Sequence, residues 1–440
     1  MRRTCKHWLT GPILLLFFTI HGQDSLRNTP LTLDDVCRLA VENSIQLKLS
    51  RTGTQLAKQQ AEITRLDALP ELSTSFTYGY LSNADVWDPG LNHHQTAGLP
   101  HPLTLFSVQA SETVFAGGRV NNAIRLSTLE EQIAFLRQEE NVTDIKFLAI
   151  AGYLDIYRLL NQRNVYINNT VLARQRLKNI LSLRRQGIVT LNDQLRTELV
   201  ISDYELATRK IANGIVRQNT ELNAILGLPD SARLTPDTSL LQQPPAVKTL
   251  EEFLAEAEHE NHELRITGRE KEVAATKLKI LKGERLPELG IYAQSNLQRP
   301  FLYNLPPIDV YYNIWQAGVG VNYDISSIYR SPHKIKAGLI GLDFAQQQDS
   351  LQRQNLEVAV KNAFNKYLES QDELRTYRND LRSAVENYRT VDKRYFNQLA
   401  LLTDLIDATN TKTESEIKVA NAEINTLYIY YQLLRTIGTL

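Results

Sequence analysis

The sequence predicts an α+β membrane protein with internal duplication, in which short β-strands contribute to a shared β-barrel and long α-helices form antiparallel coiled-coil hairpins. Three observations support this fold class. Residues of the first half of the chain recur in the second half at a constant spacing. Four short segments alternate apolar and polar side chains, and two long segments with helical patterning contain no proline.

The duplication is clearest at Leu69-Pro70-Glu71-Leu72, which recurs as Leu286-Pro287-Glu288-Leu289 at one offset in numbering (287 − 70 = 217). Towards the C-terminus the offset is smaller, as between Asp193 and Asp404 (404 − 193 = 211). A repeat of this length is too long for a solenoid unit. We therefore expect two homologous structural repeats. Their predicted bounds are 23–229 and 250–440, with a linker or equatorial segment at 230–249.

The N-terminal segment 1–22 is expected to be a signal peptide. Arg2, Arg3 and Lys6 precede an apolar run at 13–20, and the small residue Gly22 follows it. Such a run is too short to span a bilayer as a helix, and a basic stretch before it is typical of secretory signals. Export with cleavage near Gly22 is the prediction, and an uncleaved anchor is the alternative.

Each repeat is expected to begin with a helix and to continue with a strand hairpin, at 71–116 and at 288–325. In the segment 72–80, Leu72, Phe76 and Tyr78 fall on one face, whereas serine, threonine and glycine alternate on the other. This period of two indicates a β-strand. The repeat copy of this segment alternates in the same sense, and the second strands of the two hairpins are predicted at 105–115 and 314–325.

Strands of this length with one apolar and one small, polar face are typical of membrane barrels, where one side faces lipid and the other a watery lumen. A soluble β-sandwich is the alternative. The segments 82–102 and 298–309 between the strands are rich in turn-forming residues, with Pro and Asn in both and Gly and His in the first, which predicts turns and loops.

Four strands cannot close a membrane barrel, because the smallest such barrels have about eight. An open sheet edge in lipid would leave backbone groups unpaired at a cost of several kcal/mol each. The membrane interpretation therefore requires several copies of the chain, and three copies would supply twelve strands.

Most of the remaining chain is predicted to be helical. Leu374, Tyr377, Leu381, Ala384 and Tyr388 are spaced alternately by three and four residues, which is the pattern of a coiled coil. The segments 117–185 and 333–395 contain no proline, and at 1.5 Å per residue helices of this length extend about 90 to 100 Å.

Each long helix is expected to turn back at a short tip, at 186–190 and at 397–401, so that two helical hairpins form at 117–227 and 333–438. Helices of this length are not typical of a compact enzyme domain.

Composition excludes several function classes. A formal net charge of zero argues against nucleic-acid binding, which requires an excess of Lys and Arg. Cys5 and Cys37 are the only cysteines, too few for a disulfide framework or a structural zinc site. No phosphate-binding loop, zinc-protease motif or nucleophile elbow is present. We therefore expect no enzyme activity, no catalytic residue, no cofactor and no metal, and we interpret His93, His94 and His101 as solvated loop residues.

Several motifs, in order along the chain, resemble the TolC-like outer-membrane efflux proteins. They are the Leu-Thr-Leu-Asp-Asp opening at 31–35, the two Leu-Pro-Glu-Leu segments at the strand starts, Val-Phe-Ala-Gly-Gly-Arg at 114–119, and Thr-Asp-Leu-Ile-Asp-Ala at 403–408. The resemblance covers essentially the whole mature chain. It implies a homotrimer with one twelve-stranded barrel in the outer membrane, continued by an α-helical tunnel through the periplasm.

The resemblance also implies a function. We expect the outer-membrane channel of a tripartite efflux system, which passively conducts substrates delivered by an inner-membrane transporter and a periplasmic adaptor protein. The exit duct of a type I protein secretion system is an alternative on the same scaffold. A periplasmic structural coiled-coil protein is the alternative from another class.

Site residues are carried over by the same resemblance. In family members a tyrosine and two aspartates near the second tip constrict the pore, and Tyr395, Asp404 and Asp407 occupy the matching positions. Ala400 stands where an arginine is expected. Asp404 and Asp407 are three residues apart and share a helix face, so threefold symmetry would form rings of carboxylates that favour cations.

The open alternative for the two aspartates is structural. Thr403 could be a helix N-cap, with acidic residues of the first turn complementing the helix dipole. The residues expected to contact the adaptor are those of the two tips: Gly187, Ile188, Val189, Leu399, Ala400 and Leu401.

Overall fold

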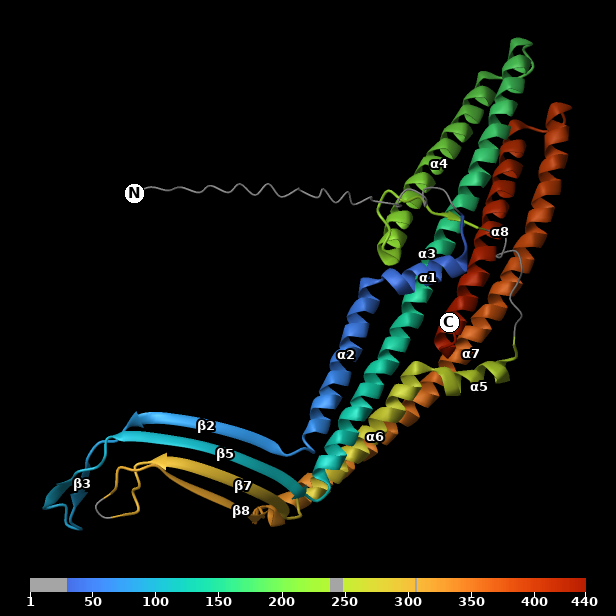
Figure 1. The fold of residues 1–440 in the computed structure, drawn as a ribbon. Coiled ribbons are helices and arrows are strands. Elements are labelled where there is room, and N and C mark those ends of the chain that lie inside the picture. The colour runs from blue at the N-terminus through green and yellow to red at the C-terminus, as the bar shows by residue number, and fades with distance from the viewer. Residues whose placement is uncertain (1–29, 238–247, 305–306) are drawn as a thin grey trace, which may run out of the picture.

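The computed structural model describes residues 30–237, 248–304 and 307–440 (Figure 1). The predicted signal segment 1–22 and positions 238–247 of the predicted linker lie outside the described residues. A long helical body makes up most of the molecule, and a sheet extends from one end of it at an angle. The helical tips lie at the opposite end of the body from the sheet.

Eight helices are found in the described ranges: α1 (Leu33–Asn43), α2 (Ile45–Leu66), α3 (Arg119–Arg185), α4 (Leu191–Leu226), α5 (Leu250–Glu260), α6 (His262–Gly283), α7 (Ser327–Phe396) and α8 (Leu402–Ile437). The strands there are β1 (Pro30–Leu31), β2 (Glu71–Tyr80), β3 (Ala84–Trp87), β4 (His94–Ala97), β5 (Pro102–Phe115), β6 (Thr235–Pro236), β7 (Glu288–Arg299) and β8 (Tyr312–Asn322).

Apart from the short strands β3 and β4, which occur only in the first half, the two halves of the chain have the same order of elements in the described residues. Helices α1 and α5, and likewise α2 and α6, have equal lengths, and their first residues differ by one offset in numbering (250 − 33 = 262 − 45 = 217). Helices α4 and α8 also have equal lengths, and their first residues differ by the smaller offset (402 − 191 = 211). The spacings found in the sequence therefore hold for these helices, and the smaller offset also holds for the ends of α3 and α7 (396 − 185 = 211), so positions in these helices have equivalents in the other half.

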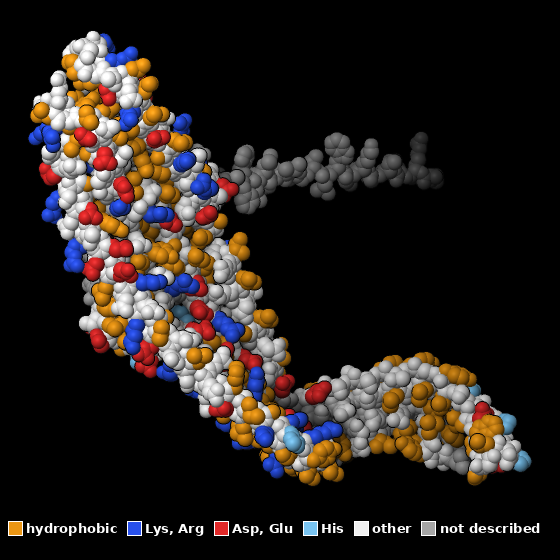
Figure 2. Space-filling model, turned by 180° about the vertical axis from the view of Figure 1, so that it is seen from behind, with side chains coloured by type: hydrophobic (Ala, Val, Ile, Leu, Met, Phe, Trp, Pro, Cys, Tyr) orange, Lys and Arg blue, Asp and Glu red, His pale blue; other side chains and the backbone are white. Residues whose placement is uncertain are grey.

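Strands β2, β5, β7 and β8 form one antiparallel sheet in that order, so β5 and β7 join the two halves while β2 and β8 are its edges. Phe76 lies opposite Phe106, which lies opposite Leu297. This face is apolar and open: Phe76 is 66% exposed and Trp315 77% exposed. Figure 2 shows hydrophobic side chains and few charged ones over the sheet, whereas many charged side chains are scattered among the other side chains of the helical body.

The helical body is held by apolar packing between the hairpins and the short helices. Tyr153 and Leu154 of α3 pack with Val36 and Ala40 of α1 and with Leu222 of α4 in the largest core. A second core joins α5 to α7 and α8. Helix α3 has 67 residues and is therefore about 100 Å long.

Within the described ranges, no helix combines the length and the apolar character needed to cross a lipid bilayer.

Several local predictions differ from the structure. The segment 82–102, expected to be loop, contains the short hairpin β3–β4, in which Trp87 stacks on His94 at 4.7 Å and Asp85 accepts a 2.7 Å hydrogen bond from Thr96. These contacts lie across the strands, so turn composition alone did not reveal them.

The second long helix begins at Ser327 rather than at 333, and it includes Pro332. The preceding strand β8 ends at Asn322, three residues before the predicted 325. Proline at this position removes one backbone hydrogen bond close to the helix start, where Ile328 and Tyr329 are both 63% exposed. Water at this exposed turn can take the place of the missing donor, so the helix continues through the proline.

Candidate pore constriction at the helical tips

The two helical hairpins turn back in the same way. Gly187 has φ +74 and Gln398 has φ +61, and the two positions are equivalent in the duplication (398 − 187 = 211). After each of them a backbone N–H closes the helix end: Ile188 donates to Leu183 at 3.0 Å, and Leu399 donates to Arg394 at 2.7 Å. The second tip thus keeps the left-handed turn of the first, but with a residue for which that conformation is strained.

The tips of the two hairpins pack against each other. Ile180 of α3 lies in one apolar cluster with Tyr395 of α7 and with Leu402 and Leu405 of α8. Val189 from the first tip and Ala400 from the second pack against the same cluster. The structure therefore brings Tyr395, Val189 and Ala400 together.

The other predicted tip residues point into solvent. Leu399 is 66% exposed, Leu401 is 70% exposed and Ile188 is 44% exposed. They form an apolar surface at the end of the molecule farthest from the sheet (Figure 1).

Tyr395 is buried, with 8% of its surface exposed, and its hydroxyl has no hydrogen-bond partner among the described residues. Burial raises the pKa of Tyr395, and the charge of Asp193 adds to this increase. The phenol is therefore neutral at physiological pH. A buried hydroxyl without a partner is uncommon, because desolvation without a compensating hydrogen bond costs free energy.

Asp404 has a structural role that the sequence only partly revealed. Helix α8 begins at Leu402, so Leu401 is the N-cap and the suggestion that Thr403 caps the helix was wrong. The carboxylate of Asp404 accepts the backbone N–H of Leu401 at 3.1 Å. At the first tip, Thr190 and Asp193 form the complete reciprocal capping box. The second tip keeps only one of the two hydrogen bonds of such a box, the one from the backbone N–H of the N-cap residue to the aspartate carboxylate.

Asp407 differs from Asp404. It is exposed on the first turns of α8, and its carboxylate makes no hydrogen bond or ion pair with any other described residue. Its equivalent in the first half is Arg196 (407 − 196 = 211), so the duplicated scaffold does not require a carboxylate there. Of the two aspartates, Asp407 is therefore the one whose charge has no partner among the described residues.

The sequence-based prediction missed Arg176. Its side chain is only 7% exposed and lies between the two hairpins, where it donates to Thr409 Oγ1 at 3.1 Å and to the Tyr388 hydroxyl at 3.3 Å. Asp392 is 3.9 Å away. The only local signal was an arginine next to the apolar heptad residues of α3, and its partners all lie in the other half of the chain.

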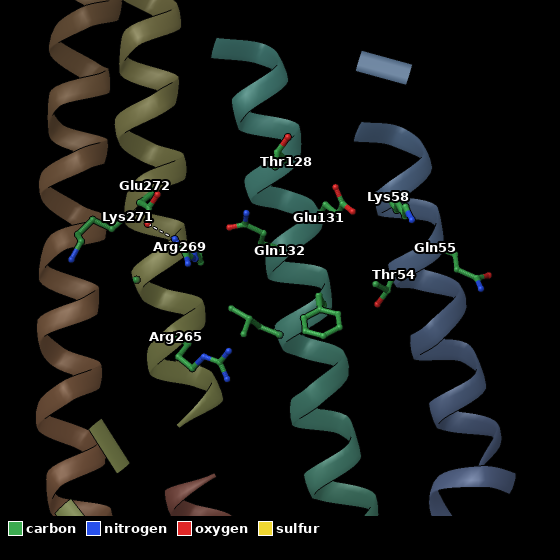
Figure 3. Close-up of a pocket in the computed structure, with 13 residues that line it drawn as sticks. Thr54, Gln55, Lys58, Thr128, Glu131, Gln132, Arg265, Arg269, Lys271 and Glu272 are labelled. Carbon is green, nitrogen blue, oxygen red and sulfur yellow. Dashed lines mark hydrogen bonds and ion pairs between the residues drawn. The ribbon is translucent and has the colours of Figure 1, made fainter. Parts of the chain in front are cut away.

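A groove of about 790 Å³ lies between α2, α3 and α6 (Figure 3). Its charges are partly neutralised by ion pairs, since Arg269 pairs with Glu272 at 2.7 Å. Lys271 turns away from the groove, toward α7, where it lies 3.2 Å from Asp349. The groove therefore offers no clear preference for one class of ligand.

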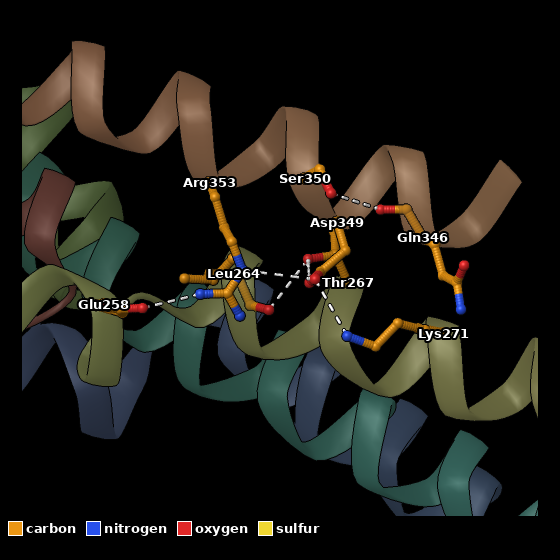
Figure 4. A network of polar contacts seen from close by, with 8 residues as sticks. All are labelled: Glu258, Leu264, Thr267, Lys271, Gln346, Asp349, Ser350 and Arg353. Carbon is orange, nitrogen blue, oxygen red and sulfur yellow. Dashed lines mark hydrogen bonds and ion pairs between the residues drawn. The ribbon is translucent and has the colours of Figure 1, made fainter. Parts of the chain in front are cut away.

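Asp349 is the centre of a polar network that links three helices (Figure 4). It is 5% exposed and accepts hydrogen bonds from Lys271 at 3.2 Å and from Thr267 at 3.3 Å, both on α6. Arg353 of α7 lies 3.5 Å from it and also donates to Glu258 of α5 at 3.0 Å. The network fixes α7 against α5 and α6 in the half of the helical body nearer the sheet.

The loop histidines have protein partners of their own. His93 lies 3.2 Å from the carboxylate of Asp88, His94 stacks on Trp87, and His101 stacks on the tyrosine that ends β2. In the part of the chain that the structure describes, no group of three His, Cys, Asp or Glu side chains is placed to hold a metal ion.

Comparison with known proteins relates this geometry to outer-membrane channels. The family model for outer membrane efflux proteins matches residues 253–439. Outer membrane protein TolC of Salmonella enteritidis is 21% identical to this chain over an alignment 440 residues long. The alignment covers 97% of this chain and 86% of TolC.

Two solved structures have a similar fold. The outer membrane protein VceC of Vibrio cholerae superposes with a TM-score of 0.79 at 13% identity, over 92% of this chain and 96% of VceC. The CmeC outer membrane channel of Campylobacter jejuni superposes with a TM-score of 0.73 at 12% identity, over 92% of this chain and 85% of CmeC.

Proposed function

We propose that this chain, a member of the TolC-like outer-membrane efflux protein family, assembles as a homotrimer and forms the passive outer-membrane channel of a tripartite efflux system. An inner-membrane transporter would deliver the solutes through a periplasmic adaptor protein. The chain is an outer-membrane protein whose helical body lies in the periplasm. The observation that supports the assembly most directly is that the four-stranded sheet of one chain ends in two unpaired edge strands.

The sheet is incomplete at both edges. Strands β2 and β8 each have one neighbour, and the central β5–β7 pairing joins the two halves of the chain. In the duplication β8 is equivalent to β5 and β2 to β7. The same pairing between chains would therefore join β8 of one copy to β2 of the next, which satisfies the edge groups that lipid cannot. Three copies close twelve strands.

The helices repeat this relation. Within the chain, Ile133 and Leu136 of α3 pack with Ile266 of α6 in a buried cluster. The equivalents of Ile133 and Ile266 are Phe344 on α7 (344 − 133 = 211) and Leu49 on α2 (266 − 49 = 217), and these are 66% and 74% exposed.

Both outer helices carry an apolar stripe with spacings of four, seven and seven residues: Ile45, Leu49, Leu56 and Ile63 on α2, and Ile340, Phe344, Leu351 and Val358 on α7. In the proposed trimer, the stripe on α7 of one copy would pack against the stripe on α2 of the next. The internal α3–α6 contact supplies the template for that packing.

The pore constriction is proposed at the second tip. Asp407, together with Asp404 and Tyr395, would lie close to the threefold axis, where each aspartate position forms a ring of three carboxylates. Such rings attract cations and resist anions. The free charge of Asp407 and the exposed position of Asp404 support this assignment. Ala400 supplies no positive charge at the position where the family has an arginine.

The adaptor is proposed to bind the same end of the molecule. Ile188, Leu399 and Leu401 form an exposed apolar surface, with Gly187, Val189 and Ala400 shaping the turns beneath it. A helical-hairpin partner of matching apolar character would bury this surface.

The test is the assembly and conductance of the purified protein. In detergent, light scattering is expected to give the mass of three chains, and the protein is expected to form discrete conducting steps in planar bilayers. Crosslinking in cells with a photoreactive group at position 399 is expected to capture a periplasmic partner. A monomer that stays soluble without detergent and gives no conductance would contradict the proposal.

A further inference from the structure

The polar face of the sheet carries a row of glutamines. Ser73 of β2 lies opposite Gln109 of β5, Gln109 lies opposite Gln294 of β7, and Gln294 lies opposite Gln316 of β8. These four side chains are neighbours at one height across all four strands. We call Gln109, Gln294 and Gln316 the glutamine row.

The glutamine row faces the interior of the assembled barrel. The adjacent residues Val108, Ala293 and Ala317 belong to the opposite, apolar face, which must meet lipid because side chains alternate along a strand. Three copies of the chain would bring nine glutamines to the same height around the pore. This orientation rests on the trimeric channel proposed above.

The three carboxamides have no protein partner. Among the described residues, no hydrogen bond joins the side-chain amide of Gln109, Gln294 or Gln316 to another residue, although their backbones pair in the sheet, and Gln109 and Gln316 are exposed. A carboxamide offers two donors and an acceptor. All of this hydrogen-bonding capacity therefore remains available to molecules inside the pore.

On the side of the glutamine row that lies away from the helices, the next two rows of the same face contain no charged residue. The next row outward on the same face consists of Ser75, Ser107, Asn296 and Ile314, and the two serine hydroxyls lie 2.8 Å apart. The row after that has Thr77, Leu105, Gln298 and Tyr312. The nearest acidic residue on this face is Glu71, in the row toward the helices.

An aromatic ring lies beside the glutamine row. Tyr292 is in the row toward the helices, opposite Ser111 and Gly318. A Cβ atom at position 318 would lie only 3.0 Å from the Tyr292 hydroxyl, so the ring rests across the glycine. Gly318 thus lets the phenol lie along the wall beside the amides.

We propose that the glutamine row is a contact site for uncharged, hydroxyl-rich solutes, of which oligosaccharides are the test class. Each sugar hydroxyl is both donor and acceptor, and carboxamides supply both partners without favouring an ion of either sign. The Tyr292 ring adds an apolar surface for the face of a pyranose ring. Binding at such a site is weak and repeated around the pore, as passage requires.

The experiment measures blockade of single channels by maltohexaose in planar bilayers. For the wild-type trimer, we expect sugar on one side to cause brief, concentration-dependent interruptions of the current. The triple variant Gln109→Ala, Gln294→Ala, Gln316→Ala is expected to lower the sugar association constant about tenfold, equivalent to about 1.4 kcal/mol.

The matched control is Ser295→Ala with Asn313→Ala. These residues form a 3.1 Å hydrogen bond on the opposite face of β7 and β8, so their replacement should leave blockade unchanged. Equal blockade of the wild type and the triple variant would overturn the proposal, as would a conducting wild type that maltohexaose does not block. A wild type that never conducts would instead overturn the channel function itself.

Discussion

At the scale of single residues, the two aspartates of the second tip have separate roles. Asp404 caps α8 through the backbone of Leu401, and its equivalent Asp193 does the same at the first tip. Asp407 has no such partner and no acidic equivalent. If rings of carboxylates select cations, the effect should therefore depend most clearly on Asp407, whereas replacing Asp404 also affects folding.

The first prediction concerns Asp407→Asn. The amide keeps the shape but removes three charges from the pore, so the permeability ratio of K⁺ to Cl⁻ should fall severalfold, while thermal stability stays within about 0.5 kcal/mol, as is usual for surface changes. Reversal potentials in a salt gradient measure the ratio. For comparison, Asp404→Asn should also destabilise the tip by about 0.5 to 2 kcal/mol. An unchanged ratio in both variants would reject the ring.

The second prediction concerns Asp349. Although burial raises its pKa, the hydrogen bond from Lys271 and the charges of Lys271 and Arg353 outweigh that effect, and its pKa lies below the ordinary value of 3.8. A carboxyl group whose pKa is lowered in the folded state stabilises that state at pH values above its ordinary pKa. This stabilisation is lost as the pH falls through the folded-state pKa.

Asp349→Asn should therefore destabilise the protein at pH 7 by about 1 to 3 kcal/mol. Loss of one partner from a buried pair costs more than this, but Lys271 and Arg353 are 38% and 50% exposed and can reach water. Urea unfolding in detergent measures the difference. It should shrink below pH 4, and a difference independent of pH would exclude the charge as its cause.

Sequence patterns located the tip residues but not the buried network around Arg176. Tyr395, Asp404 and Asp407 were assigned from resemblance, and their roles in the pore stay predictions. Arg176 could not be found in this way, because its burial depends on Thr409 of α8 and Tyr388 of α7, which only the packing of the two helical hairpins against each other brings close. Local sequence patterns predict which face of a helix is apolar, but they do not predict which other helix packs against that face.

At the scale of elements, the two tips show how duplication has diverged. Both helices end in the same left-handed turn, with Gly187 in one and Gln398 in the other. A side chain in this conformation costs about 1 kcal/mol or more. The second tip, where the constriction is proposed, is thus the less stable of the two.

The third prediction is that Gln398→Gly stabilises the second tip by about 0.5 to 1 kcal/mol, the relief of strain being partly offset by the greater freedom of glycine in the unfolded chain. Hydrogen exchange of the Leu399 amide, which bonds to Arg394, should slow about two- to fivefold. Gly187→Ala should speed exchange at the Ile188 amide. Faster exchange in Gln398→Gly would show that the turn is not strained.

Strand prediction worked best where alternation was complete. The segment 72–80 matches β2, Glu71–Tyr80, because period-two patterning is a local property. The hairpin β3–β4 lacks that pattern and depends on contacts across strands, such as Trp87 with His94. The start of α7 was misplaced because Pro332 was taken as a boundary, whereas the exposed first turns tolerate it.

The fourth prediction assigns the two faces of the sheet with neighbouring residues. Gln316→Glu would place three carboxylates in the lumen and should shift the reversal potential toward cations. Ala317→Glu would place the same charge against lipid, where burial is unfavourable, and should lower the yield of inserted trimer. Heat-modifiable mobility on gels measures that yield. The opposite pair of results would reverse the assignment of lumen and lipid faces.

At the scale of the whole molecule, the duplication explains both the fold and its incompleteness. The fold class predicted from sequence is confirmed by the four-stranded sheet with its long helical hairpins and by the similarity to VceC. Each half contributes two strands to the four-stranded sheet and one helical hairpin to the helical body. A trimer would therefore repeat this unit six times around the pore. Contacts within the chain then predict contacts between chains, which sequence periodicity alone could not place.

The fifth prediction tests that relation. Phe344 is equivalent to Ile133, which is buried against α6, so it should be buried against α2 of a neighbouring copy. Leu339 is also exposed, at 50%, but its equivalent Thr128 lines the open groove of Figure 3 (339 − 128 = 211). Neither side chain belongs to an apolar core of the described residues.

Phe344→Glu would place three charges in the helical interfaces of the trimer, where an unpaired buried charge costs several kcal/mol. Light scattering in detergent should therefore show monomers with normal helicity by circular dichroism. Leu339→Glu introduces the same residue on the same helix and should leave the trimer intact. Trimers that tolerate Phe344→Glu would mean that the copies do not meet along α2 and α7, so the internal α3–α6 contact would not be their template.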